Sequence, residues 1–126
     1  MKITMSTILV ALTIVFASSS IFADSIVASY TCKLKEGKKL EELQAVNSNW
    51  LKWVRKHVNE DIQSAVGTAV VGNQDMFLFA DTYPDLGVWA ATQTALDSDA
   101  GSEIENLFED VSKCTENRLW KFVPTK

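Results

Sequence analysis

The chain has 126 residues, with 12 basic and 16 acidic side chains and a formal net charge of −4. This length allows one domain with a single modest core. The acidic balance argues against nucleic acid as a partner, because proteins that bind it neutralise phosphates with a basic face. The lysines between positions 33 and 39 are diluted by Glu36, Glu41 and Glu42, a pattern typical of a solvated turn.

Residues 1–23 are predicted to be a secretory signal peptide. Lys2 supplies the positive start, residues 8–16 form the apolar run, and a small-residue region ends at Ala23, where cleavage is expected. The alternative, a transmembrane helix, needs about 20 apolar residues, and this run is shorter. We therefore expect an exported protein, periplasmic or secreted, with one domain over residues 24–126 and no membrane contact after cleavage.

A strand and a helix are predicted next. Residues 25–34 are rich in β-branched and aromatic side chains, which favours a strand. Residues 37–58 place apolar side chains on one face and charged ones on the other, as in an amphipathic helix. The apolar face contains two tryptophans and, at its centre, the polar Asn47. His57, near the helix end, is expected to cap the helix or lie on the surface in preference to a catalytic role.

A hairpin follows. Residues 62–71 and 76–82 predict two strands, and residues 72–75 have the composition of a hairpin turn. The second strand is apolar on both faces as far as Asp81, which indicates a sheet covered on both sides. A second covering element is therefore needed.

The last part of the chain predicts a broken helix and a strand. Asp85 is the expected N-cap of a short helix over residues 86–96. Ser102 and Glu105 have the spacing of a capping box for a second segment that ends near residue 111. Residues 115–117 predict a turn, and residues 118–123 predict the final strand.

This β-α-β-β-α-β order is that of an α+β, ferredoxin-like fold: a four-stranded antiparallel sheet with both helices on one face. The handedness of the crossovers places the first strand between the third and the fourth. Cys32 and Cys114, the two cysteines of the chain, then lie close enough to pair. An even pair in an oxidising compartment also predicts a disulfide. With one histidine, His57, widely separated from them, the ligands for a zinc site are lacking, so no metal is expected.

The chain also resembles the dimeric α+β barrel superfamily, which includes antibiotic-biosynthesis-monooxygenase-like and NIPSNAP-like domains. The resemblance rests on residues 33–38 before the first helix, on residues 81–86 before Trp89, and on the broken second helix that leads to an aromatic strand. It implies a homodimer whose two sheets face each other, which would supply the missing cover. Haem-degrading members use a histidine on the second helix and an asparagine on the first strand. This chain has neither, so no haem and no other cofactor is expected.

In such folds the pocket lies between the helices and the sheet. Asn47 would point there and either bind a ligand or satisfy a nearby backbone group. The tryptophans could line a cavity for a flat ligand, but at helical spacing they are also typical core residues. Asp81 and Asp85 could together do acid–base chemistry, although capping alone accounts for Asp85. The ligand-binding candidates are Asn47, Trp50, Asp81, Tyr83 and Trp89.

Three functions are compatible with these observations. The first is an exported homodimer that binds a small apolar or aromatic molecule. The second is a cofactor-independent monooxygenase or isomerase that acts in the same cavity. The third is a structural or interaction domain with a filled core. No catalytic residue is identified from the sequence.

Overall fold

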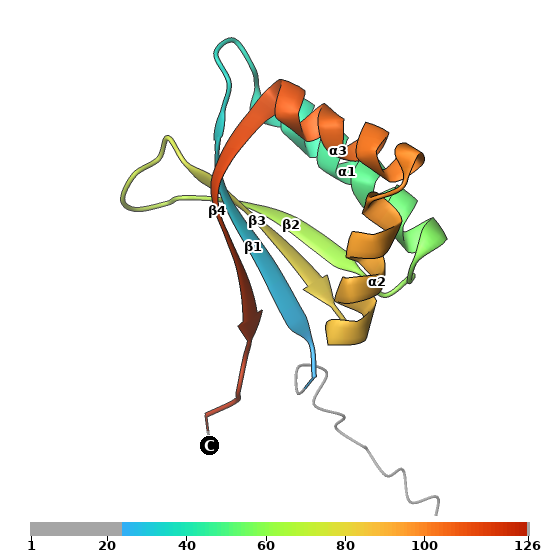
Figure 1. Cartoon of the computed structure of the whole chain (residues 1–126). Helices are drawn as coiled ribbons and strands as arrows, with labels where there is room; N and C mark the ends of the chain where they lie inside the picture. The colour runs from blue at the N-terminus through green and yellow to red at the C-terminus, as the bar shows by residue number, and fades with distance from the viewer. Residues whose placement is uncertain (1–23, 126) are drawn as a thin grey trace, which may run out of the picture.

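The computed structural model describes residues 24–125, which form one antiparallel sheet with helices on one of its faces (Figure 1). The strands are β1 (Ile26–Leu34), β2 (Gln63–Thr68), β3 (Phe77–Tyr83) and β4 (Ser112–Lys121). The helices are α1 (Leu40–His57), α2 (Leu86–Leu96) and α3 (Asp99–Val111). The strand order β2-β3-β1-β4 confirms the ferredoxin-like α+β prediction. The predicted signal peptide lies outside the described residues.

The two faces of the sheet have different surroundings, because successive side chains of a strand point to opposite sides. Ala28 and Cys32 of β1 and Phe79 of β3 face the helices and are buried. Leu78 of β3 points the other way and is 38% exposed. The core therefore fills only the space between the sheet and the helices, and the second face predicted to need a cover is open in the single chain.

Helix α1 packs its apolar face on the sheet as its sequence pattern predicts. Its buried residues include Asn47 and Trp50, while acidic residues lie in its first turn and basic residues in its last, in line with the helix dipole. Nδ1 of His57 lies 2.8 Å from the carbonyl oxygen of Trp53, and the two rings stack with centroids 4.5 Å apart. His57 thus contacts the last turn of its own helix.

The prediction for the last strand was wrong at its start. Residues 115–117 are not a turn, because β4 begins at Ser112 and pairs with β1 along its length. Cys114 therefore lies within the strand and not before it. Its polar sequence resembles a turn because β4 is an edge strand, exposed from residue 113 onward. Thr115 is an extra residue at a bulge, since Cys32 pairs with Cys114 and Thr31 with Glu116.

The predicted capping box was also wrong. Ser98, not Ser102, is the N-cap of α3, and its hydroxyl accepts a hydrogen bond from the backbone N–H of Gly101 at 3.1 Å. Gly101 lies inside α3, although glycine is unfavourable within helices. A Cβ at this position would come within 2.5 Å of the Ala95 carbonyl oxygen, so glycine is needed where α3 starts against the end of α2. The predicted N-cap Asp85 is confirmed by a 2.9 Å bond from the Val88 N–H.

The first strand of the hairpin, β2, is shorter than predicted. β2 ends at Thr68, three residues before the predicted limit, so Val70 and Val71 lie in the connection and are 86% and 90% exposed. Their β-branched side chains favour a strand locally, but no partner strand extends beside them. β2 therefore ends where its pairing with β3 ends, whatever the local preference of the sequence.

The predicted disulfide is present. Cys32 and Cys114 are bonded, with their Cα atoms 3.9 Å apart, and the bond joins the central strand β1 to the edge strand β4. Cys32 is fully buried, and the bridge spans 82 residues of sequence. In residues 24–125, no helix is both long and apolar enough to cross a membrane.

We predict that breaking this disulfide lowers the stability of the protein substantially. Loop-closure entropy for a bridge of this span corresponds to about 4.5 kcal/mol of unfolding free energy. Urea denaturation with and without a thiol reductant measures the loss. The double variant Cys32→Ala/Cys114→Ala should be as unstable as the reduced protein and should not respond to reductant. An unchanged midpoint on reduction would contradict the prediction.

Candidate functional site

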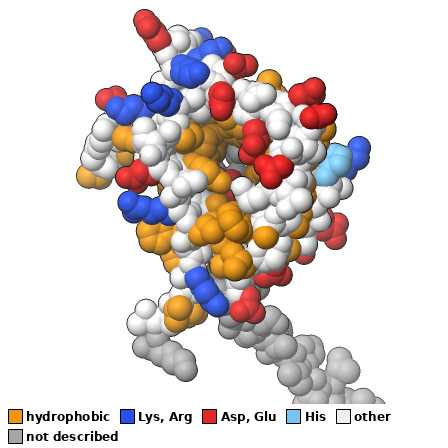
Figure 2. All heavy atoms as spheres, in the orientation of Figure 1, with side chains coloured by type: hydrophobic (Ala, Val, Ile, Leu, Met, Phe, Trp, Pro, Cys, Tyr) orange, Lys and Arg blue, Asp and Glu red, His pale blue; other side chains and the backbone are white. Residues whose placement is uncertain are grey.

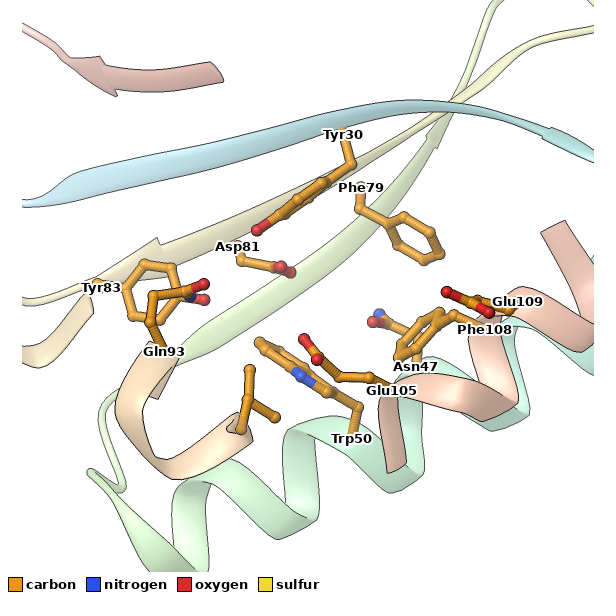
Figure 3. Close-up of a pocket in the computed structure, with 11 residues that line it drawn as sticks. Tyr30, Asn47, Trp50, Phe79, Asp81, Tyr83, Gln93, Glu105, Phe108 and Glu109 are labelled. Atoms are coloured by element: carbon orange, nitrogen blue, oxygen red, sulfur yellow. The ribbon is translucent and has the colours of Figure 1, made fainter. Parts of the chain in front are cut away.

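A cavity of about 260 Å³ lies between the sheet and the three helices. It opens to the surface, where acidic side chains border the hollow in Figure 2. Aromatic side chains form much of its wall: Tyr30, Trp50, Phe79, Tyr83 and Phe108. The polar groups of its lining are Asn47, Asp81, Gln93, Glu105 and Glu109. Leu96 completes the wall, and every helix together with the two central strands contributes to it (Figure 3).

The floor of the cavity is formed by β1 and β3. Tyr30 of β1 and Phe79, Asp81 and Tyr83 of β3 occupy alternate positions of their strands, so all four side chains point toward the helices (Figure 3). Asp81 is 6% exposed. The carboxyl group of Asp81 thus lies between Phe79 and Tyr83, the neighbouring inward positions of β3, which both carry aromatic rings.

Three polar side chains form a hydrogen-bonded chain beside the cavity. The Ser64 hydroxyl of β2 donates to Oδ1 of Asp81, its cross-strand neighbour, at 2.5 Å. Nδ2 of Asn47 in α1 donates to the same hydroxyl oxygen at 2.9 Å. Ser64 has a single hydroxyl hydrogen, and it donates that hydrogen to the carboxylate of Asp81. The hydroxyl oxygen of Ser64 in turn accepts a hydrogen bond from the amide of Asn47.

Burial raises the pKa of Asp81 from 3.8 to about 7, and the hydrogen bond from Ser64 offsets part of that rise. Removing the carboxylate from water disfavours its charged form, whereas a hydroxyl donor favours it. Asp81 is therefore close to half-ionised at neutral pH. A carboxyl group in this state can give or accept a proton near pH 7.

The charge of Asp81 also affects the pKa values of neighbouring side chains. Burial, and then the charges of Asp81 and Glu105, raise the pKa of Tyr30 to about 12. The same causes, together with Tyr30, raise the pKa of Tyr83. Both phenols therefore stay protonated and can donate hydrogen bonds. Glu105 lies at the cavity mouth, and burial, followed by the charges of Asp97 and Glu109, raises the pKa of its carboxyl group.

Four of the five predicted ligand-binding residues line the cavity, namely Asn47, Trp50, Asp81 and Tyr83. Trp89 does not: it packs against the core cluster formed around Trp50. Asp81 and Asp85 do not form the predicted pair in the cavity, because Asp85 caps α2.

Sequence reasoning missed several lining residues and Ser64. Tyr30 could have been found from its inward position, two residues from Ala28 and two from Cys32. Glu105 was assigned to a capping box and lines the cavity instead. Ser64 gave no signal of its own, because its contact with Asp81 depends on the register between β2 and β3.

In the described part of the chain, no group of three histidine, cysteine or acidic side chains is placed to hold a metal ion. The sequence matches no protein-family model. It also matches no curated protein.

Solved structures, in contrast, are similar to this chain. The cofactor-independent oxygenase SnoaB from Streptomyces nogalater is 10% identical, with a TM-score of 0.56 over 82% of this chain and 97% of that one. A NIPSNAP-like domain protein from Burkholderia xenovorans is 14% identical, with a TM-score of 0.55 over 82% and 91%. A conserved protein of unknown function from Bacteroides thetaiotaomicron is 12% identical, with a TM-score of 0.56 over 79% and 99%.

The chain has the fold of these proteins. The resemblance to the oxygenase-like and NIPSNAP-like group is thereby confirmed at the level of the fold. Identities this low show the fold alone, so the function has to be argued from the cavity.

The pKa of Asp81 predicts how stability changes with pH. Between pH 4 and 7 the folded state holds a proton on Asp81 that the unfolded state has lost, so stability should fall as pH rises through this range. The slope from this group reaches about 1.4 kcal/mol per pH unit. Asp81→Asn should remove this part of the pH dependence in urea denaturation from pH 4 to 8. Parallel curves for the two proteins would contradict the assignment.

Ser64→Ala serves as the companion variant. It removes the donor that favours the ionised form, so the pKa of Asp81 should rise further and the fall in stability should extend to higher pH. The pKa itself can be followed by the carboxyl carbon resonance of Asp81 in NMR titrations.

Proposed function

We propose that this protein binds a small apolar or aromatic molecule in the cavity between the helices and the sheet. The observation that carries this proposal is the cavity itself, with five aromatic rings and a few convergent polar groups in its lining. Ligand sites in proteins have this composition, and the volume lies just below their usual range of about 300–1,000 Å³. A compound with one ring, or two small fused rings, suits such a space.

The polar groups would orient the ligand. Asp81, Tyr30 and Tyr83 converge on the cavity from the sheet, and Asn47 approaches from α1 (Figure 3). A ligand hydroxyl or N–H group could donate to the Asp81 carboxylate, and the tyrosine hydroxyls could donate to a ligand oxygen. A filled core, as in a purely structural domain, would leave no such space.

A second candidate function is catalysis without a cofactor, as an oxygenase or an isomerase. The specific observation in its favour is Asp81, a buried carboxyl group whose pKa of about 7 suits proton transfer at neutral pH. In this proposal Asp81 accepts a proton from a phenolic or enolic ligand, and the aromatic wall positions the ring. The structural similarity to the cofactor-independent oxygenase SnoaB supports a shared fold and does not by itself support a shared activity.

The protein is also proposed to act outside the cytoplasm. The disulfide between Cys32 and Cys114 supports this location, because such bonds persist in oxidising compartments. The composition of residues 1–23 supports it independently.

The open face of the sheet supports a homodimer. Leu78, Trp120 and Phe122 on this face are 38%, 42% and 55% exposed and line one shallow groove. The Trp120 indole N–H donates to the Ser29 hydroxyl at 2.7 Å, which holds the ring against the sheet. A second copy, packed sheet to sheet, would bury these side chains, and twofold pairs of this kind are the commonest oligomers.

We predict that small aromatic hydroxyl compounds quench the tryptophan fluorescence of the protein. Hydroquinone, catechol and 1-naphthol serve as probes because each has a ring and a donor for Asp81. Asn47→Ala should weaken binding about tenfold, the value of one lost hydrogen bond. Asn106→Ala, on the exposed side of α3, is the matched control and should bind normally.

A turnover assay distinguishes the two proposed functions, ligand binding and catalysis. Consumption of dioxygen or conversion of a probe that Asp81→Asn abolishes would favour catalysis, and quenching without turnover would favour binding alone. An Asn47→Ala protein with unchanged affinity and lower stability would show that Asn47 is a structural residue.

For the dimer, we predict that sedimentation at micromolar concentration gives twice the mass of the chain. Leu78→Lys should give the single-chain mass, because it places a charge in the sheet-to-sheet contact. Leu107→Lys on α3 is the matched control, since Leu107 is 39% exposed but lies on the helical layer. A monomeric parent protein would refute the pairing.

A further inference from the structure

The charges around the cavity are all of one sign. Asp81 at its floor and Glu105 and Glu109 from α3 are acidic, and the described residues that line it include no Lys, Arg or His. Lys35 approaches α3 from outside the lining, and its ammonium group donates to the backbone oxygen of Glu109. Asp81 and Glu105 therefore face the cavity without a basic side chain in its wall.

These carboxyl groups are also absent from the ion pairs of the described residues. Lys38 pairs with Glu42 at 3.7 Å, and Arg118 pairs with Glu116 at 3.3 Å, both on the surface. A buried carboxylate without a positive partner costs free energy, and such groups in proteins are normally paired. No described residue supplies a positive partner for Asp81, so a cation that pairs with its ionised form would have to be a ligand.

The aromatic lining favours the same kind of partner. The faces of Trp, Tyr and Phe rings attract cations, and Trp attracts them most strongly. Trp50 lies beside Asp81 and Glu105 in the cavity, with Tyr30 and Tyr83 along the sheet (Figure 3). Aromatic rings combined with carboxylates are the surroundings that proteins use for ammonium groups.

We propose, building on the ligand cavity proposed above, that the molecule bound there is an organic cation. It carries an amine or a quaternary ammonium group on a compact apolar body. The charge lies between Asp81 and Glu105 and against the ring of Trp50, and the apolar body contacts Phe79 and Phe108.

The arrangement also implies an order of binding. Glu105 is at the mouth of the cavity and attracts the cation first, whereas Asp81, more than nine-tenths shielded, meets it at the floor. An anion would meet the same carboxyl groups as repulsive neighbours. The site thus discriminates by the sign of the ligand charge as well as by size.

Binding should depend on pH through the groups that face the cation. Asp81 and Tyr83 face it from β3, Tyr30 from β1, and Glu105 and Glu109 from α3; α1 and α2 contribute only uncharged groups to the lining. Both tyrosines keep their protons in this range. A permanent cation favours ionised Asp81, so its affinity should rise between pH 6 and 8 and its binding should release protons.

Four one-ring probes test the proposal by titration calorimetry on the unmodified protein. Phenyltrimethylammonium and benzylammonium are cations, benzyl alcohol is neutral and benzoate is an anion. We expect the better of the two cations to bind at least ten times more tightly than benzyl alcohol, and benzoate not to bind. The affinity of phenyltrimethylammonium should rise with pH more steeply than that of benzyl alcohol, whose hydroxyl can donate only a hydrogen bond to ionised Asp81.

Matched variants assign the effect to the cavity. Glu105→Gln should weaken phenyltrimethylammonium binding about tenfold and leave benzyl alcohol binding unchanged. Glu103→Gln removes the same charge from an exposed position of α3 outside the lining and should change neither affinity. Because Glu105 is at the cavity mouth, its replacement leaves the buried contacts of Asp81 in place.

The outcomes distinguish this inference from the function on which it depends. If benzyl alcohol binds as tightly as both cations, the cavity binds ligands but the charge preference is refuted. If Glu103→Gln weakens cation binding as much as Glu105→Gln, the attraction comes from the overall charge, and the proposed site is refuted. If none of the probes binds, both the cation site and the ligand cavity are refuted.

Discussion

The alternation of side chains along β1 and β3 is the constraint on which the rest of the structure depends. One set of positions faces the helices and carries the core, and among these positions the strands place Tyr30 and Asp81. The other set carries Leu78 and its neighbours on the open face. The cavity and the surface proposed for dimerisation are thus opposite sides of the same two strands, and a one-residue shift in register would exchange them.

Asp81 is a side chain that this arrangement disfavours in its ionised form. A carboxyl group lies where an apolar residue would pack, and its compensation within the chain is the hydrogen bond from Ser64. Such unfavourable positions concentrate at functional sites, because a protein without a use for the group would be more stable with a different residue. The proposed ligand, whether it donates a hydrogen bond or carries a positive charge, is a molecule that relieves this cost.

The fold could be predicted from the sequence because its signals are local and agree with one another. The periodicity of α1, the composition of β1 and the cysteine pair each pointed to the same topology. The errors arose where a distant partner decides the structure. β4 has the polar sequence of a turn and forms a strand because β1 lies beside it. Gly101 resembles a helix breaker and is required by the close approach of α2.

The cavity could be predicted only in part, for the same reason. Asn47 and Asp81 were visible as polar residues within apolar patterns, and both line the cavity. Ser64 gave no signal of its own and Glu105 was assigned to a capping box, because their places at the cavity depend on strand register and on which face of α3 turns toward the sheet. Trp89 shared the properties of Trp50 but packs against the same core without lining the cavity.

The single hydrogen of Ser64 has a consequence for communication between the sheet and α1. While Asp81 is ionised, that hydrogen points to the carboxylate, and the hydroxyl oxygen accepts from Nδ2 of Asn47. Once Asp81 is protonated, its own hydrogen can be donated to Ser64, which frees the hydroxyl to turn toward Oδ1 of Asn47, 3.2 Å away. Protonation of Asp81 on β3 therefore reverses the direction of the hydrogen bond between Ser64 and the amide of Asn47 on α1.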